Sequence, residues 1–302
     1  MDNYLHNLTT EEVNNQTLNI DECSTEEILL LINEQDAVVP GAVRREIPNI
    51  TRAVDIIYES LKNGGRMFYI GTGSSGRLGV LDASECPPTY GTDPEMVQGI
   101  IAGGDMALRI AVEGCEDDPN AGAKLIEDYN ISSKDVVVGI TASGGTVFVL
   151  SAIEAAKANG AATIGVTSNY DSKLSKACDV CIAPIVGPEV VIGSTRMKSG
   201  TAQKLVLNML TTGTMVKLGK VYGNLMVDLK ATNTKLYDRA KRIICHATGV
   251  DYEAAAGYLE KADDNTKLAI LIIKTELEAD QGKFLLKKYD GRLKDAIAAV
   301  KK

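Results

Sequence analysis

Two short turns combine the hydroxyl side chains and glycines that are best suited to bind an anion. The first, GTGSSG at residues 71–76, follows an apolar run at 67–70, and the second, TASGGT at 141–146, follows an apolar run at 136–140. Backbone N–H groups and the positive end of a following helix converge at such a turn. Two hydroxyl-rich turns favour a compact phosphate over an extended pyrophosphate. The hydroxyls expected to bind it are Thr72, Ser74, Ser75, Ser143 and Thr146.

The first turn also matches the GxGxxG fingerprint of dinucleotide-binding folds. That fingerprint requires an acidic residue about 20 positions further on, which holds a ribose. Asp93 and Glu95 lie near that distance, but they precede the next predicted strand instead of ending it. An NAD site and turns with a purely structural role therefore remain alternatives, while binding of a phosphorylated sugar is favoured.

Cationic side chains lie beside these glycine-bearing loops and could complete an anion site. Arg77 follows the first turn directly, and a polar loop at 187–198 contains Arg196 and Lys198. Most arginines and lysines are ordinary surface residues. Their position beside hydroxyls and glycines favours an anion-binding role for at least one of the three. Glu189 and Ser194 of the same loop join the expected substrate-binding residues.

Two acidic stretches offer carboxyl groups for acid and base catalysis. In SECPPT at 84–89, Glu85 lies where a predicted helix ends before two prolines, and a carboxylate gains nothing from the helix dipole there. In VEGCEDD at 112–118, acids gather where another helix is predicted to stop. Taken alone, the second stretch is more typical of a solvated helix end.

Histidine and cysteine are poorly placed for metal or nucleophilic chemistry. The only histidines, His6 and His246, argue against a histidine-based metal site and against a Ser-His-Asp triad. Of six cysteines, only Cys178 and Cys181 have CxxC spacing, and neither a second CxxC nor a nearby histidine accompanies them. We therefore expect structural thiols and no metal site.

The elements that must position these groups alternate along the first part of the chain. Apolar runs predict strands at 67–70, 97–101, 136–140, 162–166 and 180–184. Helices are predicted at 21–33, 50–61, from the first turn to about 85, at 107–112 and from the second turn to about 159. This alternation is typical of an α/β fold with a parallel, doubly wound sheet.

The ends of the chain are predicted to be helical. Ser24 and Glu27 fit a capping box at the start of the first helix. After the polar loop, 201–218 is predicted to be one long apolar helix, and from about 235 only helical patterns remain. We therefore expect a sugar-phosphate-binding domain at 1–235 and a small helical domain at 236–302.

Composition argues against several classes of function. The 302-residue chain has 32 basic and 40 acidic side chains, a net charge of −8, which disfavours general attraction to nucleic acid or to an acidic membrane. No stretch approaches the roughly 20 apolar residues that span a bilayer, and the first residues carry no signal-peptide pattern. We expect a cytoplasmic protein with a small-molecule substrate.

Five blocks of sequence resemble the N-acetylmuramic acid 6-phosphate etherases, which belong to the sugar-isomerase (SIS) domain superfamily. The blocks are GTGSSGRLGVLDASECPPTYG, QGIIAGG, AVEGCEDD, GPEVVIGSTRMKSGTAQKLVLNML and GKVYGNLMVDLKATN. The resemblance implies a homodimer of flavodoxin-like SIS domains with a C-terminal helical domain of ubiquitin-associated (UBA) type. It also implies cleavage of the D-lactyl ether, which gives N-acetylglucosamine 6-phosphate and D-lactate during recycling of cell-wall amino sugars, without metal or organic cofactor.

The same resemblance places the two catalytic glutamates of the family on Glu85 and Glu116, and leaves Glu113 as part of a helix end. We expect Glu116 to remove the C2 proton and Glu85 to protonate the departing lactate. Arg196 or Lys198 is expected to meet the lactyl carboxylate. One departure stands out: the family commonly shows a pattern like SGRTPY where this chain has SGGTVF at 143–148. That departure bears on ligand binding in the second turn.

Two other functions remain open. An aldose–ketose sugar-phosphate isomerase of the same fold would use a carboxylate beside an opened sugar, without a second acid at a C3 leaving group. A sugar-phosphate sensor is the non-catalytic alternative, since the animal glucokinase regulator resembles these etherases. The presence of both glutamates favours the etherase.

Overall fold

The computed structural model describes residues 8–229, 231 and 233–300. The chain forms two compact units. The first comprises Met1–Ser84 and Glu95–Thr211, and the second comprises Glu85–Pro94 and Thr212–Lys302. The domain boundary at 235 stays a prediction, since a compact unit is not by itself an independently folding domain.

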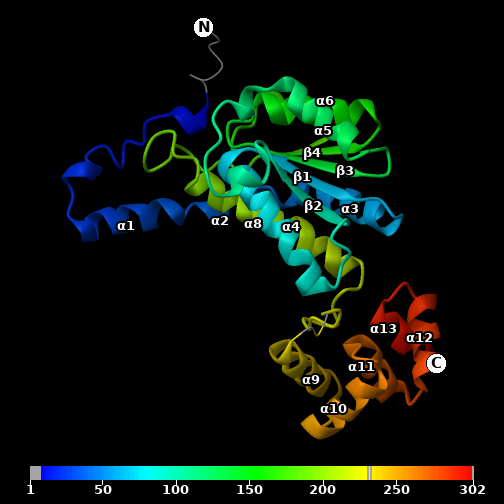
Figure 1. The fold of residues 1–302 in the computed structure, drawn as a ribbon. Coiled ribbons are helices and arrows are strands. Elements are labelled where there is room, and N and C mark those ends of the chain that lie inside the picture. The colour runs from blue at the N-terminus through cyan, green and yellow to red at the C-terminus, as the bar shows by residue number, and fades with distance from the viewer. Residues whose placement is uncertain (1–7, 230, 232, 301–302) are drawn as a thin grey trace. The chain divides into compact units, whose positions relative to one another are not determined.

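A five-stranded parallel sheet forms the centre of the first unit (Figure 1). Its order is β2-β1-β3-β4-β5, which is the flavodoxin-like arrangement. The strands are β1 (Met67–Gly71), β2 (Val97–Ile101), β3 (Val136–Ile140), β4 (Ala162–Val166) and β5 (Val180–Ile182). The α/β fold class is thereby confirmed. Four of the five predicted strands are found within one residue of their bounds, and β5 ends two residues earlier than predicted.

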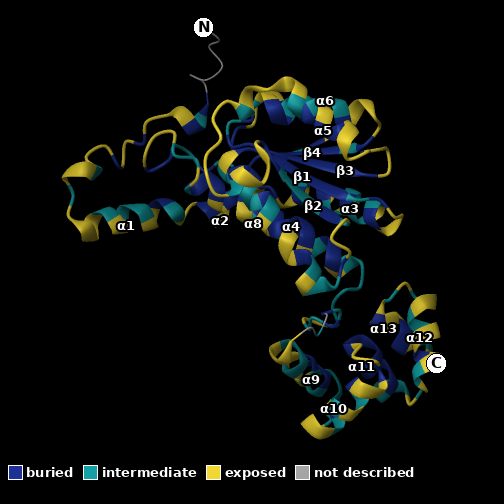
Figure 2. Cartoon of the chain, in the orientation of Figure 1, coloured by how far each residue is buried: buried dark blue, intermediate teal, exposed yellow. Residues whose placement is uncertain are grey.

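Helices cover both faces of this sheet, as Figure 1 shows. One face carries α5 (Pro119–Asp128) and α6 (Val147–Ala158); the other carries α3 (Ile47–Lys62), α4 (Gly73–Tyr90) and α8 (Lys198–Lys217). The short α7 (Lys173–Ala177) precedes β5. Every residue of β1 and β3 is buried (Figure 2), which explains why these strands are continuous apolar runs.

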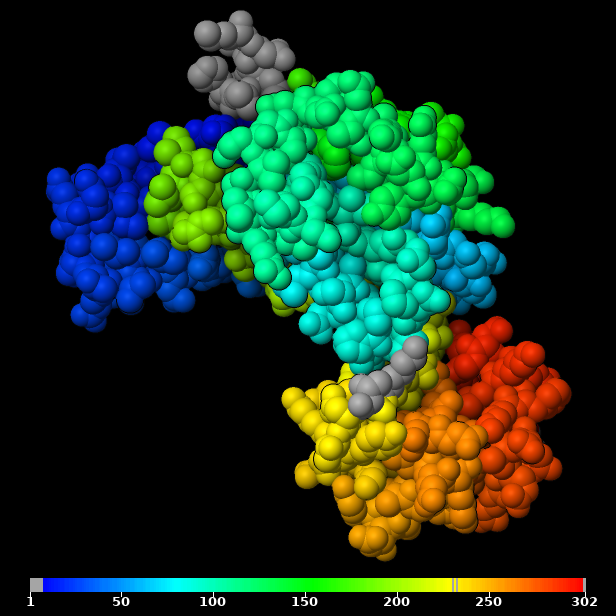
Figure 3. All heavy atoms as spheres, viewed as in Figure 1, coloured from blue at the N-terminus to red at the C-terminus, as the bar shows by residue number. Residues whose placement is uncertain are grey.

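The N-terminal segment precedes the sheet and contains α1 (Thr25–Asp36) and α2 (Val39–Arg45). The capping box predicted at Ser24 is confirmed, because Ser24 and Glu27 each accept a hydrogen bond from the other's backbone N–H. The Thr17 hydroxyl donates to the carbonyl of Val190. In Figure 3 the dark-blue N-terminal atoms accordingly lie against the yellow-green loop that precedes α8.

Two helix predictions were wrong. The helix predicted to end near Glu85 continues to Tyr90 and contains Pro87 and Pro88. A proline fixes φ near the helical value, and the burial of Cys86 holds this last turn in place. The carbonyl of Pro87 still accepts a hydrogen bond from Gly91 N. Packing therefore outweighs the cost of the missing N–H groups.

The helix predicted at 107–112 does not form. The chain instead has short 3-10 turns at Gly104–Leu108 and Cys115–Asp117. Gly103, Gly104 and Gly114 have positive φ, which interrupts any longer helix. Met106 and Ile110 are 65% and 61% exposed, so no apolar face is available to stabilise a helix of this length.

The second unit is helical, as predicted for the end of the chain. Its helices are α9 (Thr234–Thr248), α10 (Tyr252–Lys261), α11 (Thr266–Thr275), α12 (Ala279–Lys288) and α13 (Leu293–Val300). Gly249 ends α9 with φ +85°, a left-handed conformation that glycine adopts without steric cost. Among the helices of this unit, α11 contributes the largest number of residues to the buried core. Within the described residues, no helix is both long and apolar enough to span a membrane.

Candidate active site

The first turn brings α4 very close to β1. Strand β1 ends at Gly71 and α4 begins at Gly73, so Thr72 alone connects them. A Cβ atom on Gly71 would lie 2.8 Å from the backbone N of Gly76, and one on Gly76 would lie 2.7 Å from the carbonyl oxygen of Gly71. These glycines therefore serve the close approach of helix and strand.

The hydroxyls of the first turn differ in their surroundings. Ser75 is buried, and its hydroxyl donates to Oε1 of Gln203 on α8 at 2.9 Å. Thr72 is also buried, whereas Ser74 is half-buried. Ser75 thus connects the start of α4 to α8, a contact that the sequence analysis did not foresee, since it joins residues 128 positions apart.

The second turn gathers three hydroxyls at the start of α6. Oγ1 of Thr141 lies 2.7 Å from Oγ1 of Thr146 and 3.3 Å from Oγ of Ser143. Gly145 N donates to Ser143 Oγ at 3.2 Å. Thr141 completes the cluster but was not among the hydroxyls predicted to bind phosphate; its only signal in the sequence is its place as the first hydroxyl of TASGGT.

The two turns leave the sheet at the same edge. β1 and β3 are parallel neighbours, and Gly71 is paired with Ile140 in their register. Adjacent strands lie about 4.8 Å apart. The turns that start at the ends of these two strands therefore face one region of space, as the sequence predicted.

A cavity of about 210 Å³ lies beside the first turn and contains carboxylates. Arg77 Nε donates to the carbonyl of Leu108, which holds the start of α4 against the 3-10 turn. Burial and the charges of Glu116 and Glu113 raise the pKa of the Cys115 thiol beside the cavity, so this cysteine is not an activated nucleophile. The lining residues are Thr72, Gly73, Arg77, Ala102, Ala107, Ala111, Val112, Glu113, Gly114, Cys115 and Glu116.

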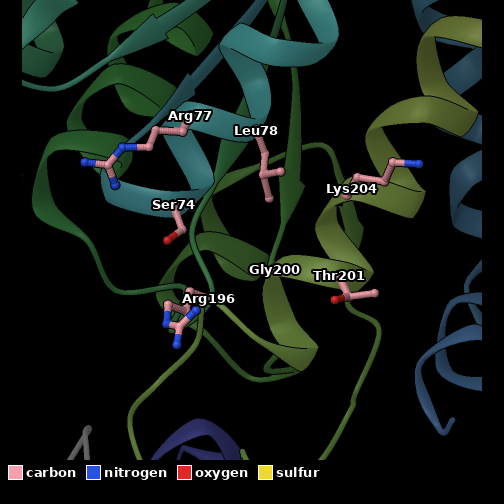
Figure 4. Close-up of a pocket in the computed structure, with 7 residues that line it drawn as sticks. All are labelled: Ser74, Arg77, Leu78, Arg196, Gly200, Thr201 and Lys204. Carbon is pink, nitrogen blue, oxygen red and sulfur yellow. The ribbon is translucent and has the colours of Figure 1, made fainter. Parts of the chain in front are cut away.

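A larger cavity of about 430 Å³ lies between α4 and α8 in the first unit. Its lining residues are Ser74, Arg77 and Leu78 on α4, Gly200, Thr201 and Lys204 on α8, and Arg196 in the loop before α8; in Figure 4 the charged ends of Arg77 and Lys204 point to opposite sides. Arg77 lines both cavities. Three cations around one hollow make it suited to an anion. Lys204 was not selected from the sequence, because its position on α8 gave no signal.

Glu189 and Lys198 form a buried polar connection at the start of α8. The Glu189 carboxylate accepts hydrogen bonds from the backbone N of Lys198 and of Ser199, each at 2.9 Å. Lys198 Nζ donates to Gln35 Oε1 at 3.0 Å. Burial lowers the pKa of Lys198, against the charges of Glu189 and Asp36. Neither the Glu189 nor the Lys198 side chain lines either of the two cavities described above. Ser194 is half-buried in the loop that precedes α8.

Glu85 is exposed on α4 and lines neither cavity of the first unit. It belongs to the second compact unit, whereas Glu116 belongs to the first. Eleven residues of the same helix separate it from Ser74, about 16 Å at the usual helical rise. The structure thus brings Glu116 together with Thr72 and Arg77, and does not bring Glu85 into that cavity.

Histidine and cysteine add little to the site. His246 is exposed on α9, and His6 lies outside the described residues. None of the six cysteines forms a disulfide. In the described part of the chain, no three His, Cys, Asp or Glu side chains are grouped closely enough to hold a metal ion.

Family models match most of the chain. The glucokinase regulatory protein N-terminal SIS domain matches residues 49–157, and the SIS domain matches residues 121–213. The C-terminal lid domain of glucokinase regulatory protein matches residues 223–276.

Curated relatives are similar over their full length. The N-acetylmuramic acid 6-phosphate etherase of Clostridium acetobutylicum is 58% identical over 98% of either chain. The etherase of Clostridioides difficile is 53% identical over 99% of this chain and 98% of the relative. A solved candidate phosphosugar isomerase of Bacteroides fragilis is 20% identical, has a TM-score of 0.50 and covers 67% of this chain and 95% of its own. That likeness shows the fold alone.

Proposed function

The chain belongs to the N-acetylmuramic acid 6-phosphate etherase family, and from this membership we propose how its site cleaves the D-lactyl ether of that substrate. The products are N-acetylglucosamine 6-phosphate and D-lactate, so the reaction serves the recycling of cell-wall amino sugars. The observation that carries the proposal is the cavity in which Glu116 meets Thr72 and Arg77 beside the phosphate-binding turns. A carboxylate base is thereby within reach of a sugar whose phosphate is held next to it.

The chemistry requires one base and one acid. An ether resists direct hydrolysis, but opening of the sugar ring creates an aldehyde at C1, which acidifies the proton on C2. Glu116 removes that proton, the C3–O bond breaks, and protonated Glu85 gives its proton to the lactate oxygen as it departs. Water then adds to C3 and a proton returns to C2, with the two glutamates in reversed roles. The scheme uses carboxyl groups alone, and each acid or base step contributes on the order of 10²–10⁴ in rate.

The phosphate of the substrate is held by the two turns. We assign it to the hydroxyls of Ser74, Ser143 and Thr146 together with Thr141, because three of these converge at the start of α6. Ser75 contributes by fixing the start of α4 through Gln203. The second turn has no arginine, so hydroxyls and backbone N–H groups serve as its binding groups.

The lactyl carboxylate is assigned to the cavity between α4 and α8. Arg196, Arg77 and Lys204 line it, and a carboxylate there would neutralise part of their charge. Glu189 and Lys198 support this site indirectly, since their hydrogen bonds fix the start of α8 next to Arg196. Ser194 belongs to the same loop.

We further propose that the enzyme is a cytoplasmic homodimer. Leu29 and Leu30 on α1 are 61% and 55% exposed, and Val191 and Ile192 in the loop before α8 are also exposed. Large apolar side chains left exposed to solvent can mark a subunit interface. Six cysteines that form no disulfide fit a reducing compartment. A partner subunit would also be able to supply Glu85 to the cavity that contains Glu116.

One assay tests the activity. The purified chain is incubated with N-acetylmuramic acid 6-phosphate, and D-lactate is measured with a coupled dehydrogenase. Release that depends on Glu116 supports the etherase. Ketose formation from an aldose phosphate, without lactate, would instead identify an isomerase.

A sugar-phosphate sensor is the second candidate, because two models built on glucokinase regulatory protein match this chain. A sensor would bind the sugar phosphate saturably and form no product. Calorimetry run beside the lactate assay therefore separates the two functions.

A further inference from the structure

In the N-terminal segment, Thr9 forms hydrogen bonds with Ser168 and Asn169, which follow the end of β4. The backbone N and the hydroxyl of Thr9 each lie 2.9 Å from Oδ1 of Asn169, and the hydroxyl also lies 3.1 Å from the carbonyl of Ser168. The neighbouring residues Leu8 and Thr10 are buried. Residues 160 positions apart are therefore joined at a packed, partly buried contact.

The opposite end of the Asn169 side chain meets the second hydroxyl turn. Its Nδ2 donates to the carbonyl of Ala142 at 3.0 Å and lies 3.5 Å from the carbonyl of Ser143. Asn169 is only 5% exposed, so both ends of its amide are used inside the protein. The side chain thus bridges Thr9 and the turn.

The turn needs such support because its middle consists of two glycines. Gly144 has φ +71°, and a Cβ there would lie 2.3 Å from Cβ of Ser172, so no other residue fits. Gly145 likewise has no side chain to restrict it. The Ala142 carbonyl also accepts hydrogen bonds from Thr167 Oγ1 at 3.1 Å and from Ser168 N at 3.0 Å. The Gly144 carbonyl accepts one from Leu174 N at 2.9 Å.

We propose that Asn169 and Thr9 are positioning residues for phosphate binding. They hold the carbonyls of Ala142 and Ser143 so that the hydroxyls of Thr141, Ser143 and Thr146 converge before any ligand arrives. A preorganised turn loses less conformational entropy on binding, so its loss lowers affinity. The inference rests on the phosphate role assigned to this turn. Because the turn meets the phosphate and not the reacting carbons, its loosening raises KM and leaves kcat nearly unchanged.

The first measurement is the affinity for inorganic phosphate. Asn169→Asp keeps the acceptor for Thr9 and removes the Nδ2 donor, and we expect it to weaken phosphate binding about tenfold, the effect of one or two lost hydrogen bonds. Thr9→Val is expected to weaken binding about threefold. Thr248→Val is the matched control, since it removes a hydroxyl bond of 2.7 Å to the Ile244 carbonyl on α9. The control should change nothing.

A double-mutant cycle separates positioning from general stability. If Thr9 acts through Asn169, the Thr9→Val change should cost nothing further once Asn169→Ala has removed the bridge. Hydrogen exchange at the amides of 144–146 should quicken in every variant that weakens phosphate binding. If Asn169→Asp fails to fold, the phosphate affinity and hydrogen exchange of Thr9→Val alone test the proposal.

The outcomes are distinct. Unchanged phosphate affinity and exchange in a folded Asn169→Asp protein would overturn the proposal, and so would a loss of kcat with KM unchanged. A wild-type chain that binds no phosphate would overturn it as well. A chain that binds phosphate, loses that affinity in the variants and yet releases no D-lactate would uphold the positioning role while refuting the proposed etherase activity.

Discussion

At the scale of single residues, Arg77 connects the two cavities of the first unit. It lines the cavity that holds Glu116 and also the cavity that holds Arg196 and Lys204. The same guanidinium can attract a substrate with negative charge at both ends. We therefore propose that Arg77 helps to place an anionic sugar with its C2 proton near Glu116.

Isotope exchange tests the division of labour between the glutamates. Glu85→Gln should still exchange deuterium from solvent into C2 of the substrate while releasing little lactate, because the base remains. Glu116→Gln should lose both exchange and release, by on the order of 10²–10⁴. Glu113→Gln, which lines the same cavity, is the control and should retain most activity. Exchange retained in Glu116→Gln and lost in Glu85→Gln would reverse the two roles.

The carboxylate site makes a separate prediction. Lys204→Gln and Arg196→Ala should lower kcat/KM for the lactyl ether about 10- to 100-fold, the effect of a charged hydrogen bond. The 3-O-ethyl ether of N-acetylglucosamine 6-phosphate keeps the phosphate but has no carboxylate, so the two variants should cleave it at the same rate as the wild type does. Kinetics on the two ethers give the comparison. Equal losses on both would show that the cations do not recognise the carboxylate.

At the scale of elements, Asp135 joins the starts of β1 and β3. Its carboxylate accepts from Arg66 N at 2.9 Å and from Ser132 N at 2.9 Å, and pairs with the Arg66 guanidinium at 3.1 Å. Burial by itself would raise the pKa of Asp135, but the hydrogen bonds from Arg66 and Ser132 outweigh it and hold the pKa below its ordinary value. The ionised form therefore stabilises the sheet.

Replacing this carboxylate should weaken the fold in a pH-dependent way. We expect Asp135→Asn to lose about 2 kcal/mol of unfolding free energy at pH 7. A lowered folded pKa means that the contribution is complete above the unfolded pKa of about 4 and disappears as the pH falls through the folded value. Urea unfolding of both proteins should thus show a constant difference from pH 5 to 8 and a shrinking one below about 4.

The control for this experiment is Asp171→Asn. Asp171 pairs with Lys176, but both side chains are exposed, and such pairs contribute about 0–1 kcal/mol. A loss in Asp171→Asn as large as that in Asp135→Asn would contradict the special role of Asp135. So would a difference that stays constant down to pH 2.

At the scale of the whole molecule, the N-terminal segment carries two kinds of surface. Thr9, Asn14 and Thr17 make hydrogen bonds to the segment after β4 and to the loop before α8. Leu29 and Leu30 on α1 are instead exposed. The segment is thus fixed at one end and presents apolar side chains at the other, which supports the proposed dimer.

Light scattering after size exclusion tests that dimer. Leu29→Glu with Leu30→Glu should weaken association at least about tenfold, because a charge at a packed interface is costly. Phe284→Glu is the control, since Phe284 is 70% exposed on α12 in the helical second unit. A purely monomeric wild type would refute the dimer, and equal effects of both changes would refute the role of α1.

Local pattern was enough to determine the sheet and its turns. β1 and β3 are buried on both faces, and only continuous apolar runs satisfy that, so the sequence places them within a residue. The capping box of α1 and the left-handed end of α9 at Gly249 are likewise set by neighbouring residues. The alternation of strands and helices then predicts that the strands are parallel. In a parallel sheet both hydroxyl turns leave from the same edge.

Only the tertiary structure decided which polar groups meet. Ser75 with Gln203, Lys198 with Gln35 and Thr9 with Asn169 lie 128 to 163 positions apart. No local propensity encodes such pairs, because a buried donor or acceptor takes whichever partner the packing of distant segments brings to it. The continuation of α4 through Pro87 and Pro88 also depends on tertiary packing, because burial of Cys86 outweighs the local tendency of proline to end a helix.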